Sequence, residues 1–247
     1  MKSHEEIERI EEEAFDGCWY LRWLKLPGVK IVEEWAFNNC QDLTDVEFGE
    51  KLETIGDGAF NNCISMRNIK MPSVRTIVNG AFLDCWQLTD VELLEVETID
   101  DGAFRVCKRL THIAIPLKDN MFLPNIHTQQ YTQFNSCENL TTVDLVGGIH
   151  NTISSLLLES WRNDMNQEID RINQDLPNTP ADEKTDAIRL WIRSVLNRMV
   201  HCKTEHYASL KEGMTQLELA LWKANLDGTE CDTTEREQLR DSKSMAL

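Results

Sequence analysis

The sequence predicts an α/β solenoid of about six coils with a parallel sheet on one face, followed by an α-helical hairpin. Three observations support this fold class. One phrase of 22–23 residues recurs along the first 146 residues, a strand-like alternation closes each copy, and a helical periodicity follows. A unit of this length cannot enclose a core by itself, so neighbouring copies must stack to bury their apolar side chains.

The repeat is centred on an Ala-Phe-x-x-Cys phrase, whose phenylalanines are spaced 22, 23, 22, 22 and then 30 residues apart. Five copies keep the alanine, and the sixth has Gln133 in that column. Apolar residues also recur eight and five residues before each phenylalanine. Ile126 fills the first of these columns in the sixth copy, and Gln129 breaks the second. The phenylalanines are Phe15, Phe37, Phe60, Phe82, Phe104 and Phe134.

Each copy ends in a Leu-x-x-Val-x-Leu phrase, as at Leu43, Val46 and Phe48. The last apolar positions alternate with polar residues, which is typical of a strand with one buried face. Proline follows directly in three copies, where its missing N–H costs least because the strand ends there. These prolines are Pro27, Pro72 and Pro116.

Taken together, the phrase V-x-x-I-x-x-x-A-F-x-x-C-x-x-L-x-x-V-x-L resembles the surface-antigen (BspA-type) class of leucine-rich repeats over about residues 5–146. The resemblance implies a right-handed solenoid with a parallel sheet along one face and short helical or extended segments on the other. It also implies a binding scaffold without shared catalysis. Many members are secreted microbial adhesins, and others are intracellular proteins of unicellular eukaryotes. This chain differs in its polar first residues and its long helical C-terminal region.

One outward column of the predicted strands alternates in charge through its first four members. Neighbouring strands lie about 4.8 Å apart, so opposite charges there favour parallel stacking by a few tenths of a kcal/mol per pair. We interpret this column mainly as self-pairing, with a recognition strip as the alternative. Its members are Lys25, Glu47, Lys70, Glu92, Ala114 and Asp144.

The neighbouring outward column mixes aromatic, acidic and neutral groups and shows no period of self-pairing. Variable side chains on a rigid sheet are what repeat proteins use for recognition. We therefore expect this column to contact a protein partner. The candidate protein-binding residues are Trp23, Asp45, Asn68, Asp90 and His112, with Thr142 in the last copy.

Acidic residues gather just before the Ala-Phe phrases, for example at Asp57 and at Asp100 and Asp101. A helix start at these points would place carboxylates against unpaired backbone N–H groups. Calcium binding is the alternative, but it needs six to eight converging oxygen ligands. Successive copies supply only one or two acids each, so we predict a structural role and no metal site.

Six of the eight cysteines occupy one column of the repeat. Identical neighbours give no basis for choosing disulfide pairs, so we expect buried free thiols of a reducing compartment. His201, Cys202 and His206 form the only compact set of soft metal ligands, and they lack a fourth partner. The cysteine column consists of Cys18, Cys40, Cys63, Cys85, Cys107 and Cys137.

We find no sequence motif for catalysis or for cofactor binding: the chain contains no phosphate-binding loop, nucleophile elbow or zinc-protease motif. Its 25 basic and 42 acidic residues give a net charge of −17, which disfavours nucleic acids and anionic bilayers. No apolar run is long enough to span a membrane. We expect a cytoplasmic, non-catalytic scaffold that binds a protein of unknown identity. The alternative is a fragment of a secreted cell-surface adhesin.

An insertion around residues 117–124 lengthens the sixth copy. Insertions in repeat proteins become loops that often bind partners. Met121 and Phe122 make this insertion less polar than a loop without a role. The alternative is that the insertion folds over the adjoining domain.

Helical periodicity begins after Gly148, and we expect the first helix to cap the last coil with Leu157, Trp161 and Met165. Thr179 precedes a proline and should start a second helix, which continues as one helix or bends near residue 203. We expect the second helix to be dispensable for folding and to bind a partner or form a coiled coil with another copy. The predicted parts are a solenoid (1–146), a helical module capping the last coil (147–226) and a flexible tail (227–247).

Overall fold

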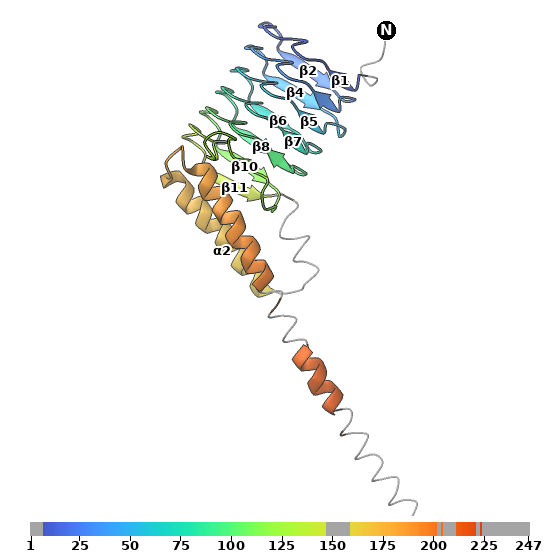
Figure 1. Ribbon diagram of the computed structural model, residues 1–247, viewed down its shortest axis with the longest axis vertical. Coiled ribbons are helices and arrows are strands. Elements are labelled where there is room, and N and C mark those ends of the chain that lie inside the picture. Colours follow the sequence, from blue (N-terminus) through green and yellow to red (C-terminus); the bar gives the residue numbers. More distant parts are fainter. Residues whose placement is uncertain (1–6, 147–158, 202–203, 205–210, 221–222, 224–247) are drawn as a thin grey trace, which may run out of the picture. The chain divides into compact units, whose positions relative to one another are not determined.

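The computed structural model describes residues 7–146, 159–201, 204, 211–220 and 223. The chain divides into two compact units, Met1–Leu196 and Asn197–Leu247, and each is considered by itself. The first unit is a parallel β-solenoid followed by helices, which confirms the predicted fold class (Figure 1). In the second unit, residues 211–220 are helical.

Strands of successive coils pair in register, so that the repeat builds two parallel sheets. The six-stranded sheet contains β2 (Trp23–Leu26), β4 (Asp45–Phe48), β6 (Asn68–Lys70), β8 (Asp90–Glu92), β10 (His112–Ile115) and β11 (Thr142–Leu145). The five-stranded sheet contains β1 (Arg9–Ile10), β3 (Ile31–Val32), β5 (Thr54–Ile55), β7 (Thr76–Ile77) and β9 (Thr98–Ile99). Equivalent strands are therefore neighbours, as predicted from the repeat.

The phenylalanine column forms the core as one continuous stack. Successive rings lie 5.0 to 5.7 Å apart and within 14° of parallel. The adjacent cysteines are free, and each thiol of the second to sixth copies donates a hydrogen bond to the phenylalanine carbonyl of the preceding coil. Cys63 Sγ, for example, lies 3.2 Å from the carbonyl oxygen of Phe37. Cysteine suits this column because it is small, apolar and still a donor.

The acidic positions before the Ala-Phe phrases begin turns and not helices, so the expected helix starts are wrong. Residues two before and two after each of the first five phenylalanines adopt left-handed backbone angles, as at Gly58 and Asn62 around Phe60, and around Phe134 only Ser136 does. These angles interrupt helical bonding, and the Phe60 N–H instead donates to the Ala81 carbonyl of the next coil at 2.8 Å. Burial raises the pKa of Asp57 there.

The insertion in the sixth copy is structural. Phe122 pairs with Ile99 as an isolated bridge that extends the five-stranded sheet, and Phe122 and Met121 are buried. The Phe122 ring packs edge-on against Phe134 at 5.8 Å. Phe122 thus takes the column five before each phenylalanine, which Gln129 breaks in the sequence. Ile126, assigned to the column eight before, is 81% exposed, which corrects its assignment to the core.

Two helical segments cover the open side of the last coil (Figure 1). They are α2 (Glu159–Asp175) with the short η3 (Leu176–Asn178), and a helix that begins at residue 184, of which residues 184–196 belong to the first unit. The second helix begins at residue 184, so Thr179 does not start it. The Thr179 hydroxyl instead donates to the Asp175 carbonyl at 3.0 Å. The buried apolar residues of these segments include Ile172, Leu176, Ile188, Trp191, Ile192 and Val195.

Polar side chains of these helices replace the bonds that a further coil would make. The Phe134 N–H donates to Thr185 Oγ1 at 3.0 Å, where earlier coils use the next coil's carbonyl. Lys184 Nζ donates to the carbonyls of Glu138 and Leu140 at 2.8 and 2.6 Å. The Val143 N–H donates to Asn173 Oδ1 at 2.8 Å.

The beginning of the second helix is thus part of the folded unit, which contradicts the expectation that this helix is dispensable for folding. Leu157 lies outside the described residues, and so do the side chains of Trp161 and Met165.

Candidate functional site

The predicted binding residues form one row across the six-stranded sheet. The parallel register pairs Trp23 with Asp45, Asp45 with Asn68, Asn68 with Asp90, and Asp90 with His112. With strands about 4.8 Å apart, the row is about 19 Å long. Trp23 is 63% exposed, Asp45 and Asp90 are exposed, and His112 is half-buried. We call these five residues the sheet-face row.

His112 is held between two carboxylates. Its Nε2 lies 3.0 Å from Asp144 Oδ2, and its Nδ1 lies 3.6 Å from Asp90 Oδ1. The sequence analysis placed Asp144 in the self-pairing column and missed this contact. Ala114 is the residue beside Asp144 in that column, so Asp144 has no charged neighbour there and bonds diagonally to His112. This gap in the charge alternation could have indicated the contact.

The charged column beside the row is partly self-paired. Lys25 Nζ lies 2.7 Å from Glu47 Oε1, and the register places Lys70 between Glu47 and Glu92. The sheet face therefore carries more carboxylates than ammonium groups, because Asp45 and Asp90 add their charges to those of the column.

Two adjacent hollows lie over the row. The larger, of about 730 Å³, is lined by Trp23, Asp45 and Pro72 among others. The smaller, of about 250 Å³, is lined by Ile69, Lys70, Asp90, Glu92 and His112. Lys70 lines both hollows.

The sequence analysis missed the larger hollow, although Gly49 marks it. Gly49 follows β4, and a Cβ atom there would lie 2.1 Å from the Pro27 carbonyl oxygen. Only glycine allows the segments that follow β2 and β4 to approach this closely, and their approach fixes one wall of the larger hollow.

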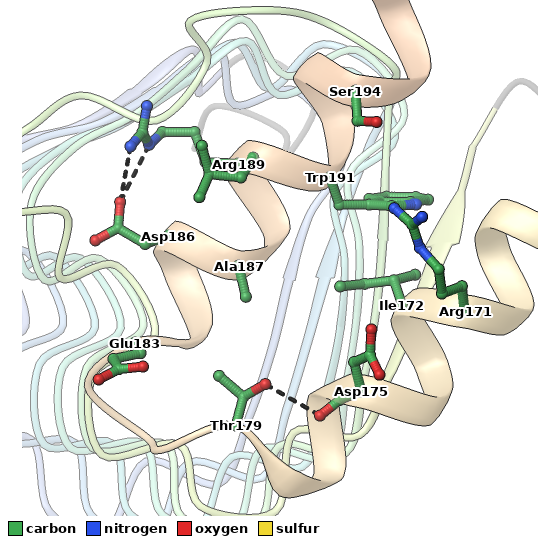
Figure 2. A pocket seen from close by; sticks show the side chains of 11 residues that line it. Arg171, Ile172, Asp175, Thr179, Glu183, Asp186, Ala187, Arg189, Trp191 and Ser194 are labelled. Carbon is green, nitrogen blue, oxygen red and sulfur yellow. Dashed lines mark hydrogen bonds and ion pairs between the residues drawn. The ribbon is translucent and has the colours of Figure 1, made fainter. Parts of the chain in front are cut away.

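A separate groove of about 770 Å³ lies between the two helical segments of the cap (Figure 2). Its charged groups are largely paired within the cap: Asp186 Oδ1 accepts from Arg189 at 2.9 Å, and Arg171 lies 3.1 Å from Glu168. Leu190 at its margin is 55% exposed. The groove suits an apolar side chain better than a charged ligand, and the sequence analysis did not predict it.

Four buried thiols of the column are poor nucleophiles. Burial raises the pKa of Cys40 to about 12. Burial also raises the pKa values of Cys63, Cys85 and Cys107. Because a thiol must ionise to attack or to bind a metal, these four thiols cannot serve as a reactive site near neutral pH. Cys18 in the first coil is exposed.

The part of the chain that the structure describes contains no group of three or more His, Cys, Asp or Glu side chains that could hold a metal ion. Of the soft-ligand set noted in the sequence, Cys202 and His206 lie outside that part. Among the described helices, none has the length and apolar character needed to cross a membrane.

A family model for the BspA-type leucine-rich repeat region matches residues 8–123 in six copies. No curated protein matches the chain significantly. Similar solved structures include a leucine-rich repeat protein of T. pallidum, with 27% identity over 56% of this chain, 63% of that chain and a TM-score of 0.49. A Bacteroides ovatus leucine-rich repeat protein shows 24% identity over 56% of this chain, 34% of that chain and a TM-score of 0.47.

A third similar structure is a leucine-rich cell surface protein of Faecalibacterium prausnitzii, with 26% identity over 56% of this chain, 43% of that chain and a TM-score of 0.40. This chain therefore spans less than two thirds of the length of each of these three proteins.

Proposed function

Because the chain belongs to the BspA-type leucine-rich repeat proteins, we propose that it is a non-catalytic scaffold that binds a protein partner through the sheet-face row. Proteins of this type commonly bind other proteins and are generally non-enzymatic. The row offers what such binding needs, namely residues of differing chemistry on a rigid backbone, with the side chains of Trp23, Asp45 and Asp90 exposed.

The observation that carries the proposal is a contrast between the two sheets. In the five-stranded sheet, Thr54, Thr76 and Thr98 repeat in register over the last three strands, after Arg9 and Ile31 in the first two. In the six-stranded sheet, the row changes from an indole to a carboxylate, an amide and an imidazole while the buried positions stay apolar. The packing of the coils does not require different residues along the sheet-face row. This variety of side chains therefore favours a role in recognition.

The charges of the face favour a basic partner. Asp45, Glu47, Asp90 and Glu92 outnumber the lysines beside them, and the whole chain carries a net charge of −17. Trp23 adds a ring face that attracts a lysine or arginine side chain. We propose a partner that presents lysine or arginine side chains across the two hollows, with association that weakens as salt is added.

The proposal is tested by the double substitution Asp45→Asn and Asp90→Asn, which removes two charges with little change of shape. The matched control is Glu11→Gln with Glu12→Gln, which removes two exposed charges from the turns outside the sheet face. Capture from the native cell should fall about tenfold for the first variant and stay unchanged for the control. Circular dichroism should be the same for all three proteins.

Equal capture by the wild type and both variants would contradict a role for the row. Loss of folding in the Asp45 and Asp90 variant would show instead that these residues hold the coils together.

We propose the cytoplasm as the place of action. The second candidate, a fragment of a cell-surface adhesin, is favoured by the family, whose members are commonly surface proteins. The state of the column thiols does not decide between the two candidate functions. Burial and the hydrogen bonds of Cys63 and its neighbours protect these thiols from oxidation in either compartment. Protease treatment of intact cells that express a tagged chain separates the candidates, because only a surface protein is cleaved.

The helix of residues 211–220 exposes Met214 and Leu217. Its pairing with a partner or with another copy stays a prediction. A Leu217→Asp substitution that leaves the sedimentation coefficient and the captured proteins unchanged would refute it.

A further inference from the structure

The two ends of the solenoid differ. The last coil is covered by the helical cap, whereas the first coil exposes residues that are fully buried in later copies. Phe37 and Cys40 are 0% exposed, but their counterparts Phe15 and Cys18 are half-buried and exposed. Leu24 on β2 is half-buried where its later counterparts are buried. We call this first-coil surface the open end.

The outer edge of β2 offers backbone groups for another strand. The carbonyls of Arg22 and Leu26 accept bonds from Thr44 and Gly49 of the second coil. Groups of alternate residues point to opposite sides of a strand, so the N–H and C=O groups of Trp23 and Lys25 face outward along the edge. Such an edge is a template for pairing with a further strand.

We propose that the open end binds the open end of a second copy, with the two β2 strands antiparallel about a two-fold axis through Leu24. In this register each Trp23 lies opposite Lys25 of the second copy, and the two residues exchange both backbone bonds. The two Leu24 side chains meet on the inner face. Each lysine then approaches an indole ring, a favourable cation–π contact that is made twice.

The sequence of β2 and the covered far end of the solenoid favour this register and a two-fold contact. A shift that centres the pair on Lys25 would oppose two ammonium groups, which is unfavourable. Head-to-tail stacking of copies is blocked because the helical cap occupies the other end through Lys184 and Thr185. A two-fold contact between open ends therefore closes as a dimer and does not continue as a filament.

The dimer is tested on the full chain by sedimentation equilibrium and by cross-linking. In the proposed register the two Leu24 Cα atoms are about 4.5 Å apart, within disulfide range. A Leu24→Cys variant should form a covalent dimer under mild oxidation, with Cys18→Ser to remove the thiol that is exposed among the described cysteines. Asp45→Cys in the same background is the control, since it lies one strand away from the edge.

A charge variant keeps the test decisive if the cysteine variant folds poorly. Lys25→Glu should weaken dimerisation on the order of tenfold, while Lys70→Glu, in the same column two strands further in, should not. A monomeric wild-type chain at about 100 μM, well above typical dimer dissociation constants, would overturn the proposal. So would a dimer that is insensitive to Lys25→Glu and cross-links no better through residue 24 than through residue 45, because another surface would then hold it.

Discussion

Replacing Lys184 by methionine tests whether polar side chains complete the last coil. The substitution keeps most of the buried volume but removes the donor that serves the carbonyls of Glu138 and Leu140. Leu140 is buried and Glu138 is exposed, so the change leaves one buried carbonyl without a donor, which costs about 1–3 kcal/mol. Burial lowers the pKa of Lys184, which shows that burying its charge already carries a cost, and methionine avoids that cost. The net destabilisation should be about 1–3 kcal/mol.

Urea denaturation of the full chain at neutral pH, followed by tryptophan fluorescence, measures this loss, since Trp191 is buried in the cap. Lys118→Met is the control. Lys118 also donates to two carbonyls, those of Glu95 and Val96, at 3.2 and 3.1 Å, but it is only half-buried. Water can replace its ammonium group, so the control should lose less than about 1 kcal/mol. Equal losses for the two variants, or a gain in stability for Lys184→Met, would refute the reasoning.

Three further outcomes follow from the solenoid. Phe60→Ala should lower the free energy of unfolding, measured by urea denaturation, by about 3–5 kcal/mol, and Phe15→Ala should lower it much less. The reason is that Phe60 stacks between two rings whereas Phe15 lies at the open end. Equal losses would argue against a continuous core. Cys18 should react with a thiol reagent within minutes at pH 8 while Cys40 reacts only after unfolding, and mass spectrometry of labelled peptides can contradict this. Burial raises the pKa of Asp100, so the folded state binds more protons than the unfolded state just above the ordinary Asp range, and stability falls as pH rises through that window. Asp100→Asn should therefore stabilise the chain at pH 7 but not near pH 3.5, and a gain that is independent of pH would exclude this cause.

The repeat made most of the solenoid predictable from sequence. Each coil makes the same contacts as its neighbours, so a column that reads Phe or Cys six times reports one packing position six times. The same logic placed the sheet-face row, because a parallel register preserves column order.

The rest depends on contacts that occur once and leave no period in the sequence. Lys184 and Thr185 read as polar helix residues, and their bonds to the last coil arise only from the docking of the helix. Phe122 takes the column five before each phenylalanine from within the insertion, whereas counting back from Phe134 gives Gln129 there and the exposed Ile126 in the column eight before. The turns at the Ala-Phe phrases escaped prediction because bonds to the next coil outweigh the local preference for a helix start.

Site-specific photo-cross-linking in the native cell tests the central claim most directly. A photoreactive amino acid at Asn68, in the middle of the sheet-face row, should trap a distinct protein that the same residue at Glu12, on the turns outside the sheet face, does not trap. Asp45→Asn combined with Asp90→Asn should suppress the trapped species. Trapping of the same proteins from both positions, or trapping that is indifferent to the two aspartates, would contradict a binding role for the row.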